Sequence, residues 1–341
     1  MKRLLDHGVI LSVLLSVFLI TSAAVFSQEA EQTRPRRVTE AEPTARTTIW
    51  RNPGSVESLD FTYGPGGAEN SPQPPFTFIE EDKDGSNPKV KVKDAAGRSW
   101  GVKWGSEVNA EVFAARIAWA AGYYVQPSYY IARGKIEGVT KVDRARKYIK
   151  SDGSFTDARF ELREEGVKKL KDKKSWRWNG NPFMGTKELS GLKIVMMLTS
   201  NWDSKDQRDE DRGSNTSIFL DEATGEERYI ITDWGGSMGK WGNYFTREKW
   251  DCKGYADQNQ EFITSAWKGR MEFGYKGQRT DDIRSGVRIT DLKWIVSYIG
   301  RITDSQLRDG LRASGATEEE VACFTRAIRE RLDQMKTIAE F

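Results

Sequence analysis

Histidine is almost absent from this sequence, and cysteine is scarce. The single histidine is His7, and Cys252 and Cys323 are the two cysteines among 341 residues. A domain that begins beyond residue 7 cannot use a Ser-His-Asp or Cys-His mechanism, and it cannot bind zinc through histidine. Catalysis would therefore have to come from carboxylates, lysine, arginine, serine, tyrosine, backbone amides or a metal ion held by oxygen ligands.

The two cysteines do not have the short spacing of a metal site. In an oxidising compartment they would either form a disulfide or remain buried thiols, and the sequence leaves both alternatives open. The formal net charge is +3, so no large excess of basic residues indicates nucleic-acid binding. Twelve tryptophans and an aromatic content of 11% are typical of a packed globular domain.

The N-terminus has the composition of an export signal. Lys2 and Arg3 precede an uncharged apolar run from Gly8 to Phe26, and small residues lie near its end. This layout predicts a secretory signal peptide over residues 1–27. An uncleaved membrane anchor is the alternative, because about 18 apolar residues can span a bilayer. In either case we expect the working domain to be exported, to the periplasm or the extracellular space.

The rest of the chain divides by composition into a tether and an α+β domain. Residues 28–75 are rich in Pro, Gly and Glu without an apolar period, which predicts a flexible linker. Residues 76–165 contain three short β-type runs, a helix and further strand. Residues 166–341 contain a buried helix, a β-hairpin and then a mainly helical pattern. Its last helix opens with a capping box at Thr317 and Glu320.

One motif stands out, the stretch ITDWGGSMG at residues 231–239. A β-branched run leads into Asp233, a tryptophan and two glycines. A strand that ends in Asp and turns at once on glycine holds a carboxylate at the rim of a sheet. Taken alone, the motif is also compatible with a simple strand and turn.

Other polar residues precede this motif in a recognisable order. They are Lys103 on the third β-type run, Glu111 on the first helix, Asp203 after the buried helix and Asn215 at a strand start. With Asp233-Trp234-Gly235, this order of parts resembles the protein-kinase-like fold. The resemblance covers roughly residues 76–240 and is closer to atypical branches, the HipA-type, spore-coat-type and secreted-pathway kinases. It implies a bilobal fold, with a small β-rich N-lobe (76–165) and a mainly helical C-lobe (166–341).

The resemblance implies a role for each of these residues. Lys103 would hold the α- and β-phosphates of ATP or another nucleoside triphosphate. Glu111 would pair with Lys103, and Glu107, one helical turn earlier, is a rival for that role. Asp203 would orient or deprotonate the acceptor hydroxyl, and Lys205 would steady the transferring phosphate.

The same resemblance implies a metal site and a loop over the nucleotide. Asn215 and Asp233 would hold Mg²⁺ or Mn²⁺ through oxygen atoms. The turn between the first two β-type runs contains Gly85, Ser86 and Lys89, and it would cover the nucleotide. A plain hairpin turn is the alternative interpretation of that composition.

The chain also departs from the protein-kinase pattern. Asn201-Trp202 stands where protein kinases usually have His-Arg, and the interval from Asp203 to Asn215 is longer than in that family. The extra residues supply three further carboxylates that could replace an assigned residue: Asp206, Asp209 and Asp211.

Three functions are compatible with these residues. The first is an exported, atypical kinase-like phosphotransferase that uses Mg-nucleotide and a hydroxyl acceptor on a protein, glycan or small molecule. The second is a pseudokinase of the same fold that acts as an envelope binding or scaffold protein. The third is a carboxylate-based hydrolase with Asp203 and Asp233 as acid and base.

Overall fold

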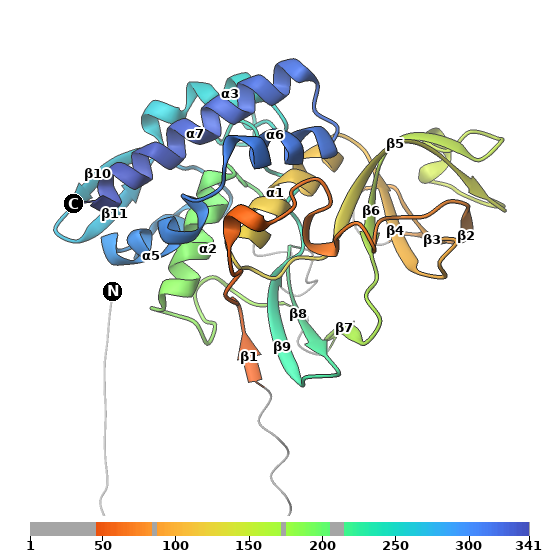
Figure 1. The fold of residues 1–341 in the computed structure, drawn as a ribbon, viewed down its shortest axis with the longest axis horizontal. Coiled ribbons are helices and arrows are strands. Elements are labelled where there is room, and N and C mark those ends of the chain that lie inside the picture. Colours follow the sequence, from red (N-terminus) through yellow and green to blue (C-terminus); the bar gives the residue numbers. More distant parts are fainter. Residues whose placement is uncertain (1–45, 84–86, 172–174, 205–214, 341) are drawn as a thin grey trace, which may run out of the picture. The chain divides into compact units, whose positions relative to one another are not determined.

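The computed structural model describes residues 46–83, 87–171, 175–204 and 215–340, which form an α+β fold (Figure 1). The strands are β1 (Arg46–Thr48), β2 (Phe76–Asp82), β3 (Lys89–Lys93), β4 (Ser99–Trp104), β5 (Ser128–Glu137), β6 (Ser154–Leu162), β7 (Val167–Lys169), β8 (Thr216–Asp221), β9 (Glu226–Ile231), β10 (Ile263–Trp267) and β11 (Arg270–Phe273). The helices are α1 (Val108–Ala120), α2 (Lys187–Leu198), α3 (Cys252–Asp257), α4 (Thr280–Arg284), α5 (Ile289–Ile299), α6 (Asp304–Ala313) and α7 (Glu318–Glu340).

Five strands close into a barrel in the order β2-β3-β4-β6-β5. Successive side chains of a strand point to opposite faces, so every second side chain points into the barrel and fills its interior. On the antiparallel pair β3 and β4, Val90 lies opposite Val102, and Val92 lies opposite Trp100. These residues belong to a hydrophobic core of the barrel's own. Residues between them, such as Lys103, are therefore directed to the other face of the sheet.

A second sheet has the strand order β1-β9-β8-β7, and β10 and β11 form a separate two-stranded sheet. Strands β8 and β9 are the predicted hairpin, with Ile218 opposite Tyr229. Ile218, Tyr229 and Ile231 belong to the large hydrophobic core. Phe219 and Ile230 belong to a smaller cluster with Tyr124. The hairpin is thus buried on both faces, and its end positions the residues that follow Ile231.

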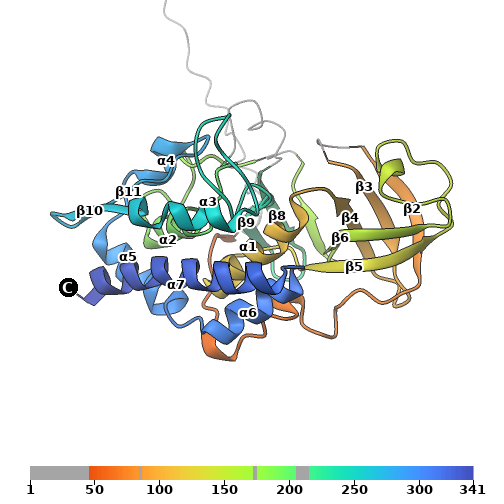
Figure 2. The same cartoon turned by 90° about the horizontal axis from the view of Figure 1, so that it is seen from above.

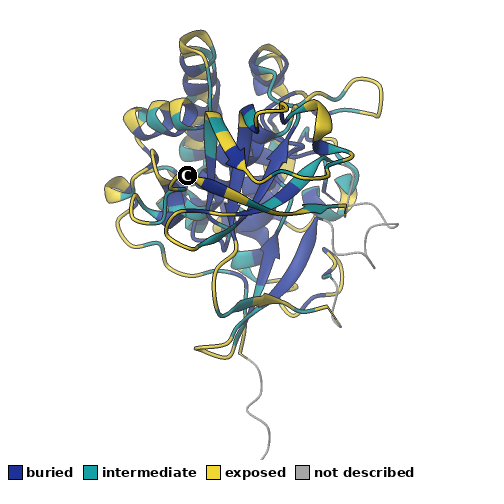
Figure 3. Cartoon of the chain, turned by 90° about the vertical axis from the view of Figure 1, so that its right-hand side faces the viewer, coloured by how far each residue is buried: buried dark blue, intermediate teal, exposed yellow. Residues whose placement is uncertain are grey.

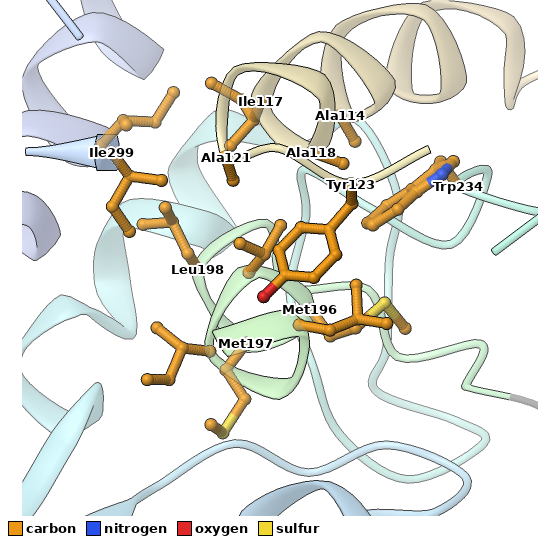
Figure 4. Close-up of a cluster of buried hydrophobic side chains, with 14 of the residues drawn as sticks. Ala114, Ile117, Ala118, Ala121, Tyr123, Met196, Met197, Leu198, Trp234 and Ile299 are labelled. Atoms are coloured by element: carbon orange, nitrogen blue, oxygen red, sulfur yellow. The ribbon is translucent and has the colours of Figure 1, made fainter. Parts of the chain in front are cut away.

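Helix α1 joins the barrel to the helices, since it contacts β5 and β6 as well as α2, α5 and α6. Figures 1 and 2 both show it between the barrel and the remaining helices. Its alanine-rich sequence favours a helix and allows close packing. Figure 4 shows Tyr123, just after α1, surrounded by Ala118, Met196 and Leu198. The Tyr123 hydroxyl donates to the Glu188 carbonyl at 2.7 Å, which ties α1 to the start of α2.

Capping side chains fix where several of the helices begin, α7 and α2 among them. The predicted capping box at Thr317 and Glu320 is confirmed, because the Glu320 amide donates to the Thr317 hydroxyl at 3.2 Å and the Thr317 amide donates to the Glu320 carboxylate at 2.8 Å. At α2, the Thr186 hydroxyl accepts from the Leu189 amide. The residues of α2 after Glu188 are buried, and Figure 3 shows the buried segments gathered at the centre of the fold.

The predicted flexible linker over residues 28–75 is wrong for its second half. Residues 46–75 contain β1 and two 3₁₀ turns, Val56–Ser58 and Gly64–Gly66. Val56 and Phe61 are fully buried in the large core. The sequence did not reveal this, because isolated apolar anchors between prolines and glycines have no helical or strand period. Residues 28–45 lie outside the described residues.

The cysteines form a disulfide, so the first of the two alternatives is confirmed. Cys252 at the start of α3 and Cys323 on α7 have Cα atoms 6.2 Å apart. The bridge therefore ties α7 to the segment that follows the Asp-Trp-Gly motif. Within the described parts of the chain, no helix is long and apolar enough to cross a membrane.

Candidate functional site

The candidate site is built around Lys103 on β4. Lys103 Nζ lies 2.6 Å from Glu111 Oε1 and 2.8 Å from Glu107 Oε2. The predicted pairing with Glu111 is present, and the rival Glu107, which directly precedes α1, also contacts the lysine. Because the lysine and Glu111 are buried, the Coulomb attraction between them is screened less by water than in a surface ion pair.

Sequence reasoning missed two further members of this cluster, Arg159 and Glu161 on β6. Arg159 Nη1 lies 3.2 Å from Glu111 Oε2 and 2.9 Å from Glu161 Oε2. In the antiparallel register Arg159 lies opposite Lys103, so the two cations share one face of the barrel. The alternation in DARFEL, with Phe160 inside the barrel, is the signal that could have revealed them.

Burial and the neighbouring charges together shift the pKa values of these groups. Burial on its own lowers the pKa of Lys103, but the neighbouring carboxylates, Glu111 foremost, outweigh it and raise the pKa above the ordinary lysine value. Burial raises the pKa of Glu111 to about 7, despite the opposing charges of Arg159 and Lys103. Against the effect of burial, the charge of Lys103 lowers the pKa of Glu107 to about 2. Lys103 is therefore a permanent cation at the centre of the site.

The Asp-Trp-Gly turn lies directly against this cluster. Asp233 Oδ1 accepts from the Gly235 amide at 2.8 Å, which orients the carboxylate just after β9. A Cβ on Gly235 would lie 2.9 Å from atoms of the Glu107 side chain, and a Cβ on Gly236 would lie 2.7 Å from Asp203 Cβ. The backbone passes so close to Glu107 and Asp203 that glycine is favoured at both positions. A larger side chain there would push Asp233 away from the neighbouring carboxylates.

Asn201 links the Asp233 turn to the segment that carries Asp203. Its side-chain nitrogen Nδ2 donates to the Asp233 backbone carbonyl at 3.1 Å. Its side-chain oxygen Oδ1 accepts from the Asp203 backbone amide at 3.2 Å. Gln278, which sequence reasoning missed, donates to Asp203 Oδ1 at 2.8 Å. Asn215 donates to the Asp203 carbonyl at 2.7 Å. The structure thus brings Asp203, Asn215 and Asp233 together, although they are distant in the sequence.

The Asp203 carboxyl group is suited to accept a proton near neutral pH. Burial, together with the nearby charges of Asp233 and Glu107, raises its pKa to about 6. A general base is most effective when its pKa lies near the working pH. This is the protonation behaviour that activation of a hydroxyl group requires.

Three carboxylates form a candidate metal site. Single oxygen atoms of Glu107, Glu111 and Asp233 all lie within 4.8 Å of one another. Carboxylate oxygens are the ligands that Mg²⁺ and Mn²⁺ prefer, so this donor set fits such an ion. Glu111 Oε2 makes no hydrogen bond, but Arg159 Nη1 lies 3.2 Å from it, so a metal ion here would share the Glu111 carboxylate with an arginine. This donor set contains Asp233, as predicted, together with two glutamates that the sequence had assigned to the lysine.

Of the predicted residues not yet discussed, the structure describes only Lys89. Lys89 lies opposite Lys103 in the register of β3 and β4, and its Nζ is 3.5 Å from Asp82 Oδ2. Asn87, in the same turn, donates to Glu107 Oε2 at 2.5 Å. The other predicted residues lie outside the described residues: Gly85, Ser86, Lys205, Asp206, Asp209 and Asp211.

Comparisons with known proteins give similarities of fold only. No protein-family model and no curated protein sequence matches the chain. Among solved structures, the Helicobacter pylori proinflammatory kinase CtkA matches at 14% identity and TM-score 0.47, covering 79% of this chain and 96% of its own. A Golgi casein kinase matches at 12% identity and TM-score 0.40, covering 85% of this chain and 77% of its own. The Golgi casein kinase with Mn and ADP bound matches at 11% identity and TM-score 0.37, covering 79% and 73%.

All three TM-scores are below 0.5, so no functional conclusion is drawn from them. The function is inferred from this chain's own side chains.

Proposed function

We propose that the chain is an exported, atypical kinase-like phosphotransferase that uses a nucleoside triphosphate with Mg²⁺ or Mn²⁺. The observation that carries the proposal is the contact of Lys103 with two carboxylates that cluster with Asp233. Three carboxylates at one position repel one another unless cations compensate them. Lys103 and Arg159 compensate Glu111, and Lys103 and Lys249 compensate Glu107. A phosphate-bound metal ion would compensate Asp233.

In this proposal the fold is bilobal, and the nucleotide lies between the lobes. The barrel, with α1, forms the N-lobe over residues 76–165, and residues 166–341 form the C-lobe. Lys103 belongs to the first lobe, and Asp203 and Asp233 belong to the second. Such an arrangement suits phosphoryl transfer, which depends mainly on positioning and charge neutralisation.

Each residue then has one task in the reaction. Lys103 binds phosphate oxygens, and Asp203 takes the proton of the acceptor hydroxyl. The acceptor oxygen forms the new bond to phosphorus as the bond to the nucleoside diphosphate breaks. Asp233, with Glu107 or Glu111, would hold the metal ion, and the ion when bound would neutralise charge on the phosphates. The acceptor is a hydroxyl group of a protein, a glycan or a small molecule.

Calorimetric titration of Mg·ATP into the purified protein tests the site. We expect binding by the wild type that requires the metal, and loss of that binding in Asp233→Asn. Asp203→Asn should still bind Mg·ATP but should lower the rate of transfer by about 100-fold or more, because it removes the general base. Asp333→Asn, on the exposed part of α7, is the matched control and should change neither. Full transfer activity in both Asp203→Asn and Asp233→Asn would contradict the proposal.

A pseudokinase that serves as an envelope binding or scaffold protein is the second candidate. The long interval between Asp203 and Asn215 favours it, since the protein-kinase motif has a shorter interval at this place. A folded wild type that shows no metal-dependent nucleotide binding would favour this alternative over the phosphotransferase. In both proposals residues 1–27 direct export to the periplasm or the extracellular space, or anchor the protein in the membrane.

A further inference from the structure

Glu107 and Glu111 are the two carboxylates that could hold a metal ion together with Asp233, and their other partners distinguish them. Both oxygen atoms of Glu111 are engaged by cations, since Lys103 Nζ lies 2.6 Å from Oε1 and Arg159 Nη1 lies 3.2 Å from Oε2. The side chains of Lys103 and Arg159 are only 7% and 10% exposed, and both project from strands of the barrel. A divalent ion bound to Glu111 would therefore lie beside two buried cations that cannot move into solvent.

Glu107 differs because one of its oxygen atoms is engaged by a side chain that can leave. Its Oε2 atom lies 2.8 Å from Lys103 Nζ and accepts from Asn87 at 2.5 Å. Its Oε1 atom lies 2.6 Å from Lys249 Nζ, and the Lys249 side chain is 28% exposed. A lysine ammonium on its flexible four-carbon stem can exchange a carboxylate for water. A metal ion can therefore reach Glu107 by displacing one lysine side chain.

The backbone on either side of Lys249 is held independently of this contact. The Glu248 carbonyl accepts from Trp202 Nε1 at 2.7 Å, and the Trp250 amide donates to the Ser237 carbonyl at 3.1 Å. Movement of the Lys249 ammonium away from its carboxylate partner therefore requires rotation of the side chain alone, and the segment that carries it can stay in place.

Glu107 is also close to Asp233. Single oxygen atoms of the two carboxylates lie within 4.8 Å of each other, and a Cβ on Gly235 would lie 2.9 Å from atoms of the Glu107 side chain. An ion bound to both carboxylates would lie near Lys249 Nζ, which contacts the same glutamate. Two cations at one carboxylate repel each other, so the ion and the lysine exclude one another.

We propose that Lys249 is an internal competitor of the metal ion: it neutralises Glu107 in the metal-free protein and is displaced when a divalent cation binds Asp233 and Glu107. The inference rests on the proposed function, because it concerns the metal ion of that function. The Lys249 contact lowers the apparent affinity for the metal, since it must break before the ion binds. Occupancy of the metal site is thereby coupled to the segment that follows the Asp-Trp-Gly motif.

Acetylation of lysine side chains, followed by mass spectrometry of the peptides, tests the displacement in the full protein. Saturating Mn²⁺ should raise the acetylation rate of Lys249 about tenfold, because a hydrogen bond to a charged group no longer holds the nitrogen. In Glu107→Gln the rate should be high with and without Mn²⁺. Lys253, an exposed lysine on α3, is the internal reference and should react at one rate in every sample.

Calorimetric titration of Mn²⁺ tests the competition. Lys249→Met removes the competing charge and should bind Mn²⁺ about tenfold more tightly than the wild type, whereas the control Lys253→Met should bind as the wild type does. Unchanged acetylation of Lys249 in the Mn²⁺-bound protein, or equal Mn²⁺ affinity of Lys249→Met and wild type, would overturn the inference. Absence of Mn²⁺ binding would overturn it as well. In each case Mg·ATP binding by the same protein would leave the proposed function standing, and its absence would remove both.

Discussion

Asp94 is a buried carboxylate that connects the barrel to the segment before it. Its Oδ1 accepts from the Arg98 amide at 2.9 Å, and its Oδ2 accepts from Trp100 Nε1 at 3.0 Å and from the Gln73 amide at 3.3 Å. Burial alone would raise the pKa of Asp94, but these hydrogen bonds, with that of the Arg98 side chain, lower it below the ordinary value. The ionised form is therefore the one that the fold stabilises.

We predict that Asp94→Asn lowers the free energy of unfolding at pH 7 by about 1.5–3 kcal/mol, the range for hydrogen bonds to a charged group. The folded-state pKa lies below the unfolded-state pKa of about 3.9, so the contribution is complete above the unfolded value and is lost as the pH falls through the folded value. Urea unfolding of both proteins at pH 7 and at pH 3 measures this. A difference that stays constant or grows toward pH 3 would contradict the assignment.

At the candidate site, the sequence singled out the residues that belong to an ordered motif and missed those that do not. Lys103, Glu111, Asp203 and Asp233 were found because their order along the chain is distinctive, and the structure brings them into one region. Arg159 was missed because the alternation in DARFEL indicates which face of the strand it lies on but not which residues lie beside it. Its position is fixed by the register of β6 against β4, and pairing between strands distant in sequence cannot be read from composition.

At the scale of elements, α7 supports the segment that carries the candidate base. Arg331 on α7 is fully buried, and its Nη1 donates to the Leu198 carbonyl at 3.1 Å and to the Ser200 hydroxyl at 2.8 Å. These groups lie at the end of α2, directly before Asn201. The C-terminal helix therefore helps to position Asp203 although it is distant in sequence, and its own place is fixed in part by the disulfide to α3.

We predict that replacing both Cys252 and Cys323 by serine lowers the free energy of unfolding by about 2–5 kcal/mol. The bridge closes a loop with a sequence separation of 71, and its loss allows the unfolded chain more conformations. Denaturant unfolding of the double variant measures the loss. Treatment of the wild type with a reducing agent should reproduce it and should have no effect on the double variant. Equal stability of variant and wild type would show that the bridge does not contribute.

At the scale of the whole molecule, the sequence predicted the elements better than their assembly. The capping box at Thr317, the buried helix α2 and the β8–β9 hairpin follow from local patterns. Closure of five strands into a barrel does not, because it depends on the pairing of β2 with β5 across a long stretch of chain. Residues 46–75 were mistaken for linker for the same reason, since β1 pairs with β9 and the carbonyls of Val56 and Phe61 accept from Gln306 and Arg116, all later in the sequence.

The segment of residues 46–75 is held by both apolar and polar contacts. Val56 and Phe61 are buried, and burial of each such side chain contributes about 1.5–3 kcal/mol. The fully buried Arg116 donates to the Phe61 carbonyl at 2.7 Å. Gln306 on α6 donates to the carbonyls of Val56 and Leu59 at 2.8 and 2.9 Å. Without the segment, these donors would lose their acceptors and α1 and α6 would expose apolar surface.

We therefore predict that a chain starting at Phe76 does not fold, whereas a chain starting at Ala45 does. Each buried donor that loses its acceptor costs about 1–3 kcal/mol, so with the lost apolar contacts the total approaches the whole stability of a typical domain, about 5–15 kcal/mol. Thermal unfolding followed by near-ultraviolet circular dichroism compares the two chains. A cooperative transition at the same temperature in both would mean that residues 46–75 do not contribute to the fold. Loss of the transition only in the shorter chain would place the N-terminal boundary of the folded domain before β1, rather than at β2 where composition places it.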